Sequence, residues 1–521
     1  MRKFLILLLA CLTVLPLLAA CTKQNHTTPG TATSGEASGT QSPADTEPET
    51  DEWGRVIEPT DFDVSGLDFG GEKLTVLCAG HDENGYWAMD PGLYKKPSDA
   101  LEMALYKRNM QIEQDLGLTL KVAYQPANGG ADSKLNKTVE TAAKSGLNEY
   151  DIVVNYAAYG VVENLRGYYM DLLAADTPHL QLDKPWYNQN FIENTQAFGH
   201  LYYIIGDYNL CAYNRLMATY FNRTLCAAYE LIPDDSGDAL YDLVQEKKWT
   251  YSRLFEFAKF SHDLNGNGEK DAGDIYGLLS NAGCEGYDGF LYAFNLDLTV
   301  TNDDGTHEWN VNNNQKMTDA MEKLISLWRQ DGVWMVGKTP NSGSTSEDQY
   351  KMFADGHALF DIDVIYRYAA QNKAFRAMKD KYGLLPLPKY DEEQKNYGSG
   401  AQDSYGMTSI MKGSEELNAR RCAYLEYANY LSYQNSRPYY FEKIMKAQYL
   451  GTAKASQVFD IILDHADFDF GEQYSVALEY AKKLLWRNVA KNEETVSGAW
   501  ATNETLLTKK LQDLDAWFLA Q

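Results

Sequence analysis

Hydrophobic and polar positions in the first part of the chain alternate between two periods, which predict strands and helices in turn. Short apolar runs predict three strands, at 73–78, 119–124 and 151–155. A helix is predicted between the first two strands, because Leu101, Leu105, Ile112 and Leu116 recur at helical spacing. A second helix is predicted through 138–144. This β-α-β-α-β order predicts an α/β fold with a parallel sheet covered by helices on both faces.

The remainder of the chain continues to alternate between helical and extended patterns. Helices are predicted at 249–260 and 317–334, a strand ended by prolines at 382–390, and a strand followed by a long helix at 404–431. The last helix places Leu507, Leu511, Leu514 and Phe518 on one face. The length of 521 residues allows roughly three or four domains, or two large ones.

The first twenty residues have the pattern of a signal peptide. Arg2 and Lys3 precede an apolar run over 4–20 that Pro16 interrupts, and the run ends in Leu18-Ala19-Ala20-Cys21. This ending resembles the lipobox of bacterial lipoproteins, which implies that Cys21 is lipidated and holds the protein at the extracellular face of the cell membrane. An ordinary secreted protein with an incidental cysteine is the alternative. Residues 21–59 are expected to form a flexible Ser/Thr/Gly/Pro tether.

Composition excludes one class of partner and favours another. The 521 residues carry a formal net charge of −26, which opposes binding to the phosphates of nucleic acids. The chain contains 37 tyrosines, a residue that offers a flat apolar face and a hydroxyl together. Aromatic faces with neighbouring polar groups suit sugars, which have apolar C–H faces and polar edges.

The order of several motifs resembles that of the bacterial extracellular solute-binding proteins of family 1, the carbohydrate receptors of ABC importers. The matching motifs, after the lipobox and tether, are G-x-L-Y…YN at 199–214, W-T…L…A at 249–258, F-x-x-G-x-A-L at 353–359 and YGLLPLP at 382–388. The resemblance covers almost all of residues 60–521. The body is longer than that of compact sugar receptors of this family.

The resemblance implies a two-lobed fold of the periplasmic-binding-protein type (type II), with two parallel or mixed sheets and a hinge of three crossovers near Asp207, Gly356 and Gly400. It assigns 60–207 with 357–400 to the first lobe, and 208–356 with 401–521 to the second lobe. The expected function is that of a monomeric, non-enzymatic receptor that binds a carbohydrate and delivers it to permease subunits. The carbohydrate is expected to be an oligosaccharide. A secreted glycoside hydrolase and a surface glycan- or peptide-binding lipoprotein without a transporter remain alternatives.

The segment DLNGNGEKDAGD at 263–274 matches the spacing of a calcium-binding loop. Calcium prefers six to eight oxygen ligands, and alternate positions of a tight loop point their oxygens inward. The predicted ligands are Asp263, Asn265, Asn267, Glu269 (through its backbone carbonyl), Asp271 and Asp274. Asp274 stands where a glutamate is usual. The alternative is an acidic turn that faces solvent, and the predicted role of the ion is structural.

Candidate solute contacts are taken from strand ends and from the expected crossovers, where ligands of such sheets lie. They are Tyr86, Trp87, Tyr156, Tyr159, Asp207, Tyr208, Tyr287, Asp361, Tyr366, Arg367, Asp403 and Tyr405. The alternative for each aromatic residue is that it packs in the core or lies on the surface. The alternative for each charged residue is that it forms an ion pair at the hinge.

Overall fold

A computed structural model of the chain describes residues 50, 51, 55, 60–80, 97, 100–127, 130–174, 177–365, 375 and 377–521. The signal peptide, Cys21 and most of the predicted tether lie outside the described residues. So do four of the candidate solute contacts, which are Tyr86, Trp87, Tyr366 and Arg367.

The first sheet contains four strands in the order β13-β3-β1-β2. They are β1 (Glu72–Ala79), β2 (Leu118–Gln125), β3 (Ile152–Tyr156) and β13 (Gly406–Ile410). β1 pairs in parallel with β2 and β3, and β13 adds an antiparallel edge. The last six residues of β1 are buried, as expected for a strand covered on both faces. The predicted β-α-β-α-β sheet is therefore confirmed.

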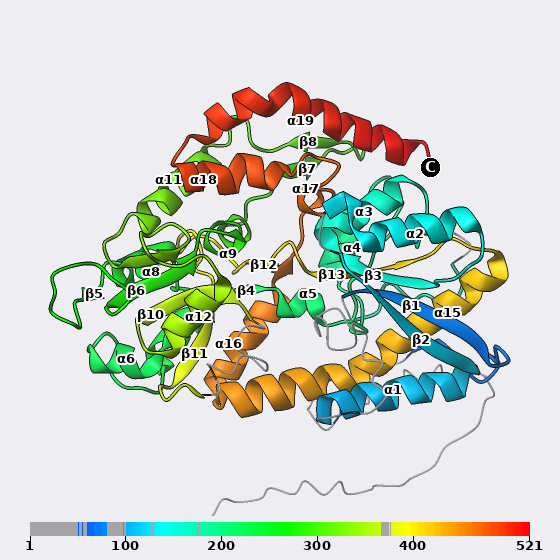
Figure 1. The fold of residues 1–521 in the computed structure, drawn as a ribbon, viewed down its shortest axis with the longest axis horizontal. Helices are drawn as coiled ribbons and strands as arrows, with labels where there is room; N and C mark the ends of the chain where they lie inside the picture. The colour runs from blue at the N-terminus through cyan, green and yellow to red at the C-terminus, as the bar shows by residue number, and fades with distance from the viewer. Residues whose placement is uncertain are drawn as a thin grey trace, which may run out of the picture. The chain divides into compact units, whose positions relative to one another are not determined.

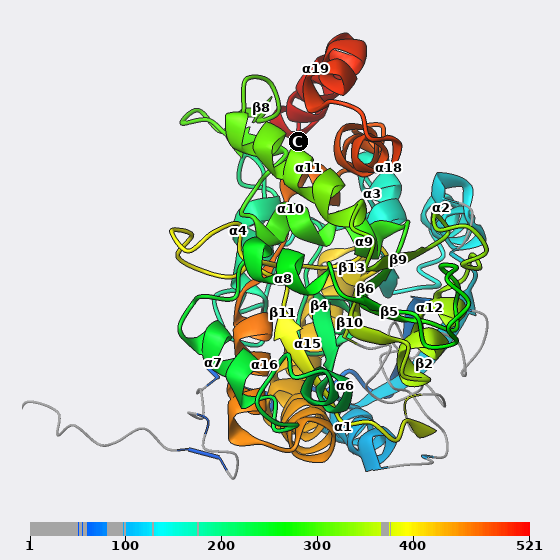
Figure 2. The ribbon, with the colours of Figure 1, turned by 90° about the vertical axis from the view of Figure 1, so that its left-hand side faces the viewer.

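The second sheet contains the strands β11-β4-β10-β6-β5, with β9 paired to β6 (Figure 2). They are β4 (Met217–Asn222), β5 (Ser261–His262), β6 (Ile275–Asn281), β9 (Val333–Val336), β10 (Ala358–Val364) and β11 (Tyr382–Pro386). β6 runs parallel to β9 and β10, whereas β4 runs antiparallel to both β10 and β11. The residues around each sheet are called the first and second lobes below.

Two further pairs of short strands lie outside these sheets. The antiparallel pair is β7 (Thr299–Thr301) with β8 (His307–Trp309), and the parallel pair is β12 (Ser399–Gly400) with β14 (Ala466–Asp467). The helices of the first half are α1 (Ala100–Leu116), η1 (Gly130–Asp132), α2 (Lys134–Ser145), α3 (Ala157–Leu165), α4 (Gln189–Thr195), α5 (Cys211–Asn214), α6 (Arg223–Ala228), α7 (Asp238–Gln245) and α8 (Tyr251–Phe257).

The helices of the second half are coloured from green to red in Figure 1, in chain order. They are α9 (Cys284–Tyr287), α10 (Gly289–Ala293), α11 (Gln315–Trp328), α12 (Ser346–Ala354), α15 (Glu415–Leu431), η2 (Ser432–Ser436), η3 (Tyr439–Leu450), α16 (Ala453–Asp464), α17 (Phe470–Gln473), η4 (Lys483–Arg487), α18 (Asn488–Asn492) and α19 (Val496–Leu519).

Local sequence signals explain where several helices begin and end. The Ser133 side chain accepts a hydrogen bond from the backbone of Asn136 at the start of α2, and Gly146 ends that helix in the left-handed conformation. Thr495 caps α19 in the same way, by accepting from the backbone of Gly498. Leu507, Leu511, Leu514 and Phe518 are buried on one face of α19, as predicted.

The chain passes between the two sheets at three places. It leaves the first sheet between Ile204, which bridges to Thr408, and the start of β4 at Met217. It returns between β11 and β13, at 387–405. It passes to the second lobe again through η2 and η3. These helices join α15 of the first lobe to α16, which packs on β11 of the second sheet. The predicted crossovers near Asp207 and Gly400 lie within the first two of these segments.

The predicted crossover near Gly356 is wrong, and so is the assignment of the strands of 357–400 to the first lobe. Gly356 joins α12 to β10, and β10 lies between β4 and β6 in the second sheet. β11 also belongs to that sheet, while β13, which was assigned to the second lobe, pairs with β3 of the first. A buried apolar strand looks the same in either sheet, because its partner is distant in sequence.

Helix α19 contacts both lobes (Figure 1). Toward its C-terminus, Trp517 and Phe518 pack on Tyr202 of the first lobe, with ring centroids 5.6 and 6.2 Å apart. Along its length α19 also packs on β8 and α11. At β8, the carboxylate of Asp515 accepts a hydrogen bond from the backbone of His307 at 2.8 Å. The last helix therefore ties the β7–β8 hairpin to the first lobe.

The second crossover passes so close to Tyr292 that two of its residues must lack a side chain. A Cβ atom on Gly400 would overlap the Tyr292 ring, and one on Gly398 would overlap the Tyr292 carbonyl oxygen. We predict that Gly400→Ala lowers the free energy of unfolding by about 1–3 kcal/mol, the usual cost of overpacking. Urea denaturation measures this loss. Gly66→Ala is the control, because nothing lies within 4 Å of its added Cβ; equal effects of both substitutions would contradict the close approach.

Candidate ligand site between the two sheets

A cavity of about 240 Å³ lies at the carboxyl end of the first sheet, where β3 ends and α3 begins. Here the backbone of the second crossover meets α3: the Ala157 amide donates to the Tyr405 carbonyl at 2.9 Å, and the Ala158 amide donates to that of Asp403 at 3.3 Å. The lining residues are Gly130, Ala158, Tyr159, Asp403, Glu472, Ser475, Tyr480, Lys482, Lys483 and Arg487. They come from the first lobe, the second crossover and the C-terminal segment 470–487.

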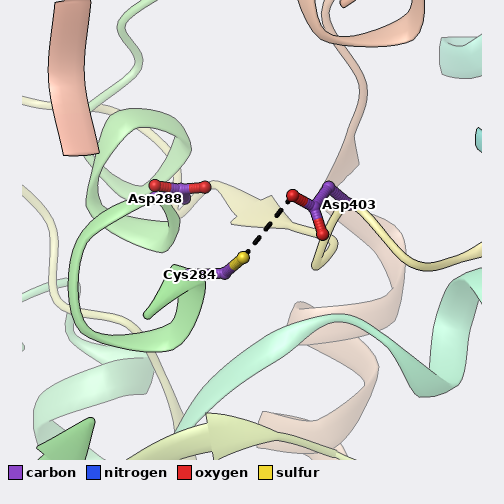
Figure 3. Close-up of side chains that lie close together, drawn as sticks. All are labelled: Cys284, Asp288 and Asp403. Carbon is purple, nitrogen blue, oxygen red and sulfur yellow. Dashed lines mark hydrogen bonds between the residues drawn. The ribbon is translucent and has the colours of Figure 1, made fainter. Parts of the chain in front are cut away.

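The second lobe approaches this cavity through α9, which follows the carboxyl end of β6. The Cys284 thiol donates to Oδ2 of Asp403 at 3.5 Å, and Asp288 lies beside them (Figure 3). One ligand atom from each of these three residues lies within 4.8 Å of the others, close enough to hold a metal ion. The chain supplies its own cation there instead, namely Arg487.

Arg487 joins the two carboxylates. Its Nε donates to Oδ1 of Asp288 at 3.0 Å, and its Nη2 pairs with Oδ2 of the same carboxylate. Nη2 also donates to Oδ2 of Asp403 at 3.1 Å. The guanidinium therefore links η4, the α9–α10 boundary and the second crossover. Behind it, Lys482 pairs with Glu472 and lies 3.6 Å from Asp288.

The electrostatics of the cluster keep Asp403 ionised and Cys284 neutral. Burial alone would raise the pKa of Asp403, but the charges of Lys482 and Arg487 and hydrogen bonds from Arg487 and Cys284 outweigh it, so the pKa is lowered. Burial, together with the carboxylates of Asp403 and Asp288, raises the pKa of the Cys284 thiol well above its usual value. The thiol thus acts as a hydrogen-bond donor to Asp403 rather than as a thiolate nucleophile.

Two tyrosines flank the mouth of the cavity. Tyr159 is half-buried, and the Tyr480 side chain is exposed; both approach Gly130. Glu479 and Tyr480 adopt left-handed backbone conformations, with φ of 56° and 57°, which are unfavourable for residues other than glycine. Lys510 of α19 holds Glu479 by an ion pair at 2.6 Å, and the Tyr480 amide donates to the Ser475 carbonyl at 2.6 Å. Such strained residues occur often at ligand clamps.

The structure places two of the predicted solute contacts, Tyr159 and Asp403, on the cavity wall. Tyr156 is buried behind them and packs edge-on against Tyr159, with ring centroids 6.3 Å apart. It supports the wall without forming it.

Five other predicted contacts are corrected by their burial in the core. Tyr287 donates to the sulfur of Met335, Tyr405 donates to Gln473, and Tyr208 accepts from the Tyr424 hydroxyl. Asp361 lies within β10, not in a loop, and accepts from Gln349 at 2.7 Å. Asp207 pairs with Arg437 at 3.1 Å in the first crossover, which is the hinge ion pair foreseen as its alternative role. Burial raises the pKa of Asp207 to about 6, although Arg437 and Arg55 oppose this.

Sequence reasoning missed the C-terminal side of the cavity, including Glu472, Tyr480, Lys482 and Arg487. Arg487 lies 84 positions from Asp403 and 199 from Asp288, so no local motif connects them. Cys284 follows the end of β6, and the strand-end rule that gave Tyr159 could have found it.

The 263–274 loop brings together the side chains predicted as calcium ligands. Asp263 accepts from the amides of Gly266 and Gly268 at 2.6 and 2.8 Å, and Gly268 has the predicted positive φ of 75°. The amide nitrogens of Asn265 and Asn267 donate to the carboxylate of Asp271 at 3.0 and 2.7 Å. At the end of the loop, Asp274 accepts from the amides of Leu264 and Asp271, both at 3.2 Å.

These contacts fit a calcium ligand set with one adjustment. Oxygens of four predicted side chains, Asp263, Asn265, Asn267 and Asp271, belong to one tight turn, as the ion requires. The two asparagines direct their NH₂ groups at Asp271, and a rotation of each amide would present its oxygen instead. The carbonyl of Glu269 and the carboxylate of Asp274 are the other two members of the predicted set.

Comparison with known proteins confirms the fold. No family model matches the chain, and no curated protein matches its sequence. Solved structures that resemble it include an ABC-transporter-associated binding protein from B. animalis subsp. lactis in complex with β-1,6-galactobiose, at 14% identity and a TM-score of 0.53 over 85% of this chain and 98% of that one. An ABC substrate-binding protein from Listeria monocytogenes in complex with cycloalternan matches at 14% identity and 0.52, over 85% and 99%.

A third similar structure is an ABC transporter solute-binding protein from Thermotoga lettingae bound with α-D-tagatose, at 16% identity and a TM-score of 0.52 over 85% of this chain and all of that one. The two-lobed fold of the periplasmic-binding-protein type is therefore shown. Among the described residues, none of the helices is both long and apolar enough to cross a membrane.

A group of carboxyls behind the cavity makes stability depend on pH. Burial and the neighbouring carboxylates of Asp297 and Asp467 raise the pKa of Asp469 to about 7, although the Glu472 amide and Lys482 oppose this. The folded state thus holds this proton more tightly than the unfolded chain does. Its stabilising contribution is complete below about pH 4 and is lost as the pH rises through about 7.

We predict that Asp469→Asn removes much of this loss. Asparagine keeps the cap of α17, where the Asp469 side chain accepts from the Glu472 amide. The variant should gain on the order of 2–4 kcal/mol in unfolding free energy relative to the parent between pH 4 and pH 7. Urea denaturation at a series of pH values measures the difference. Asp304→Asn, in an exposed turn, is the control; parallel curves for parent and Asp469→Asn would contradict the assignment.

Proposed function

We propose that this protein is an extracytoplasmic solute receptor of an ABC importer that binds a carbohydrate between its two lobes. The observation that carries the proposal is the cavity at the carboxyl ends of strands, where the first lobe, the second crossover and the C-terminal segment meet and where α9 of the second lobe approaches. Ligands of open α/β sheets bind at this edge. The similar structures described above hold β-1,6-galactobiose, cycloalternan and α-D-tagatose.

The chemistry of the cavity supports a sugar as the solute. Tyr159 and Tyr480 offer aromatic faces to the apolar C–H face of a sugar ring. Asp403 and Arg487 offer an acceptor and a donor to hydroxyl groups. A micromolar complex requires about −8 kcal/mol, which a few such contacts in a concave site supply.

Binding would act on the arrangement of the lobes. A solute that touches α3 on one side and the Arg487 network on the other favours the conformation in which both contacts are made. The shift in population equals the difference in affinity between the closed and open conformations. The closed receptor would then be the form that docks on permease subunits.

The carboxylates of the site suit a receptor better than a glycoside hydrolase. A hydrolase needs one carboxyl poised to donate a proton and a second one ionised beside it. Asp288 and Asp403 share the Arg487 guanidinium, and Glu472 is held by Lys482. Burial and the charge of Asp288 raise the pKa of Glu472 well above its usual value, but the other acidic residue of the lining, Asp403, is already paired with Arg487. No ionised carboxylate of the described lining is therefore left unpaired to act beside Glu472. We therefore propose that the receptor is non-enzymatic.

We also propose that the receptor is a monomer and that it is anchored at the extracellular face of the membrane through lipid on Cys21. The lipobox-like ending at 18–21 supports the anchor.

We predict that Tyr159→Ala weakens binding of the tightest sugar about 5- to 20-fold, or about 1–2 kcal/mol, because an aromatic face is lost. The measurement is calorimetric titration of the purified protein with a panel of neutral mono- and oligosaccharides. Tyr159→Phe is the matched control, since it keeps the ring and removes only the hydroxyl. Parent-like affinity of Tyr159→Ala, with an unchanged melting temperature, would remove this residue from the site. Absence of binding across the panel would contradict the proposed function.

We further propose that the 263–274 loop binds a structural Ca²⁺. A site with a dissociation constant of about 0.1 mM in about 1 mM calcium would stabilise the fold by about 1.4 kcal/mol. EGTA is therefore expected to lower the melting temperature of the parent by about 1–2 °C and to leave that of Asp263→Ala/Asp271→Ala unchanged. Asp304→Ala, in another acidic turn, should respond like the parent. An unchanged melting temperature of the parent in EGTA would contradict the proposal that the loop binds a stabilising calcium ion.

A further inference from the structure

The internal pairing of the cavity wall leaves one donor group and one acceptor atom for a ligand. Among the described residues, Arg487 uses Nε and Nη2 on Asp288 and Asp403, and its Nη1 has no protein partner. Asp403 accepts the bonds from both Cys284 and Arg487 on Oδ2, which leaves Oδ1. Both side chains line the cavity, with 16% and 36% of their surface exposed. Because Nη2 and Oδ2 are 3.1 Å apart, the unused Nη1 and Oδ1 belong to two groups in direct contact, the guanidinium of Arg487 and the carboxylate of Asp403.

We propose that Arg487 and Asp403 together recognise two adjacent hydroxyls, a vicinal diol, on an uncharged sugar. The proposal rests on the proposed function and specifies the ligand of the same site. A hydroxyl is both a donor and an acceptor. One hydroxyl oxygen accepts a hydrogen bond from Nη1 of Arg487, and the neighbouring hydroxyl donates to Oδ1 of Asp403. Both bonds involve a charged protein group, which makes them stronger than bonds between neutral partners.

The charges around this pair disfavour an acidic sugar. Arg487 lies between Asp288 and Asp403, and Lys482 lies between Glu472 and Asp288. The buried part of the wall thus sets two cations against three carboxyls, and both cations are already paired. Lys483, the third cation of the lining, is exposed to solvent, which screens its charge. A uronic acid placed here would bring its charge close to that of Asp403, which is costly in a partly buried site.

The flanking tyrosines determine how such a sugar is oriented. Tyr159 and Tyr480 both approach Gly130, on the first-lobe side of the cavity, while the Arg487 network faces α9. A sugar ring whose apolar face rests on these tyrosines directs its edge hydroxyls toward Arg487 and Asp403. The backbone of Tyr480 is held in a turn in which its amide donates to the Ser475 carbonyl, and Lys510 pairs with the neighbouring Glu479.

The first test compares neutral and acidic sugars on the parent protein. Calorimetric titration is done with β-1,6-galactobiose, cellobiose and maltose, and with analogues in which one ring is a uronic acid. The inference predicts that the tightest neutral sugar binds at least tenfold more tightly than its uronic acid analogue. Equal or tighter binding of the uronic acid would overturn the proposal while leaving a sugar receptor in place. Absence of binding by every sugar would overturn the proposed function and the diol pair together.

The second test uses monodeoxy derivatives of the tightest neutral sugar. In the parent, removal of either hydroxyl of the diol should weaken binding about tenfold, and removal of any other hydroxyl should cost less. Asp403→Asn alters the group that accepts from one of the two hydroxyls. In this variant, the derivative that lacks that hydroxyl should therefore bind as tightly as the intact sugar does. A purely structural role of Asp403 would lower all affinities by the same factor, and that result would overturn the pairing.

Arg487→Lys provides an independent variant for the other hydroxyl. Lysine keeps the positive charge beside Asp288 but removes Nη1, so the second deoxy derivative should become equivalent to the intact sugar. Lys491→Gln, at an exposed position of α18 away from the cavity lining, is the control and should preserve the parent pattern. The melting temperature without sugar shows whether each variant is folded. The comparison with the uronic acid needs only the parent, so the proposal can fail even where a variant does not fold.

Discussion

The charge of Arg487, enclosed by two carboxylates, is the interaction on which the arrangement of the site depends. Without it, Asp288 and Asp403 would face each other across less than 5 Å with like charges. With it, α9, the second crossover and η4 are fixed around one guanidinium. Loss of one partner of such a buried group typically costs about 3–5 kcal/mol, because the remaining charge stays unpaired. The network thus combines three distant segments into one wall.

The C-terminal segment extends this wall and links the lobes. Residues 470–487 run from α17, which packs on α3 and α4, to η4, which packs on α9. Helix α19 then contacts Tyr202 of the first lobe and the β7–β8 hairpin. A movement of the lobes therefore has to be accommodated within these contacts as well as at the three crossovers.

Much of the first lobe could be predicted from sequence, because its strands and helices alternate locally. The second sheet could not, since β10 and β11 find their partners through long-range pairing that the apolar pattern leaves open. Tyr159 and Asp403 followed from the rule that ligands lie at strand ends and crossovers. Tyr287 and Tyr405 satisfied the same rule but face the core, because a residue's position does not determine the direction of its side chain at a chain turn. Asp361 is buried because β10 continues to Val364, past the predicted end of the strand. Arg487 had no local signal.

The central claim is that one solute contacts both sides of the cavity at once. Hydrogen–deuterium exchange with and without the tightest-binding sugar tests it most directly, because α3 lies on the first-lobe side of the cavity and η4, which carries Arg487, packs on α9. The account predicts that amides of both segments exchange more slowly, and at the same sugar concentration, when the sugar is present. Protection of only one segment, or of neither while the sugar is bound, would contradict it.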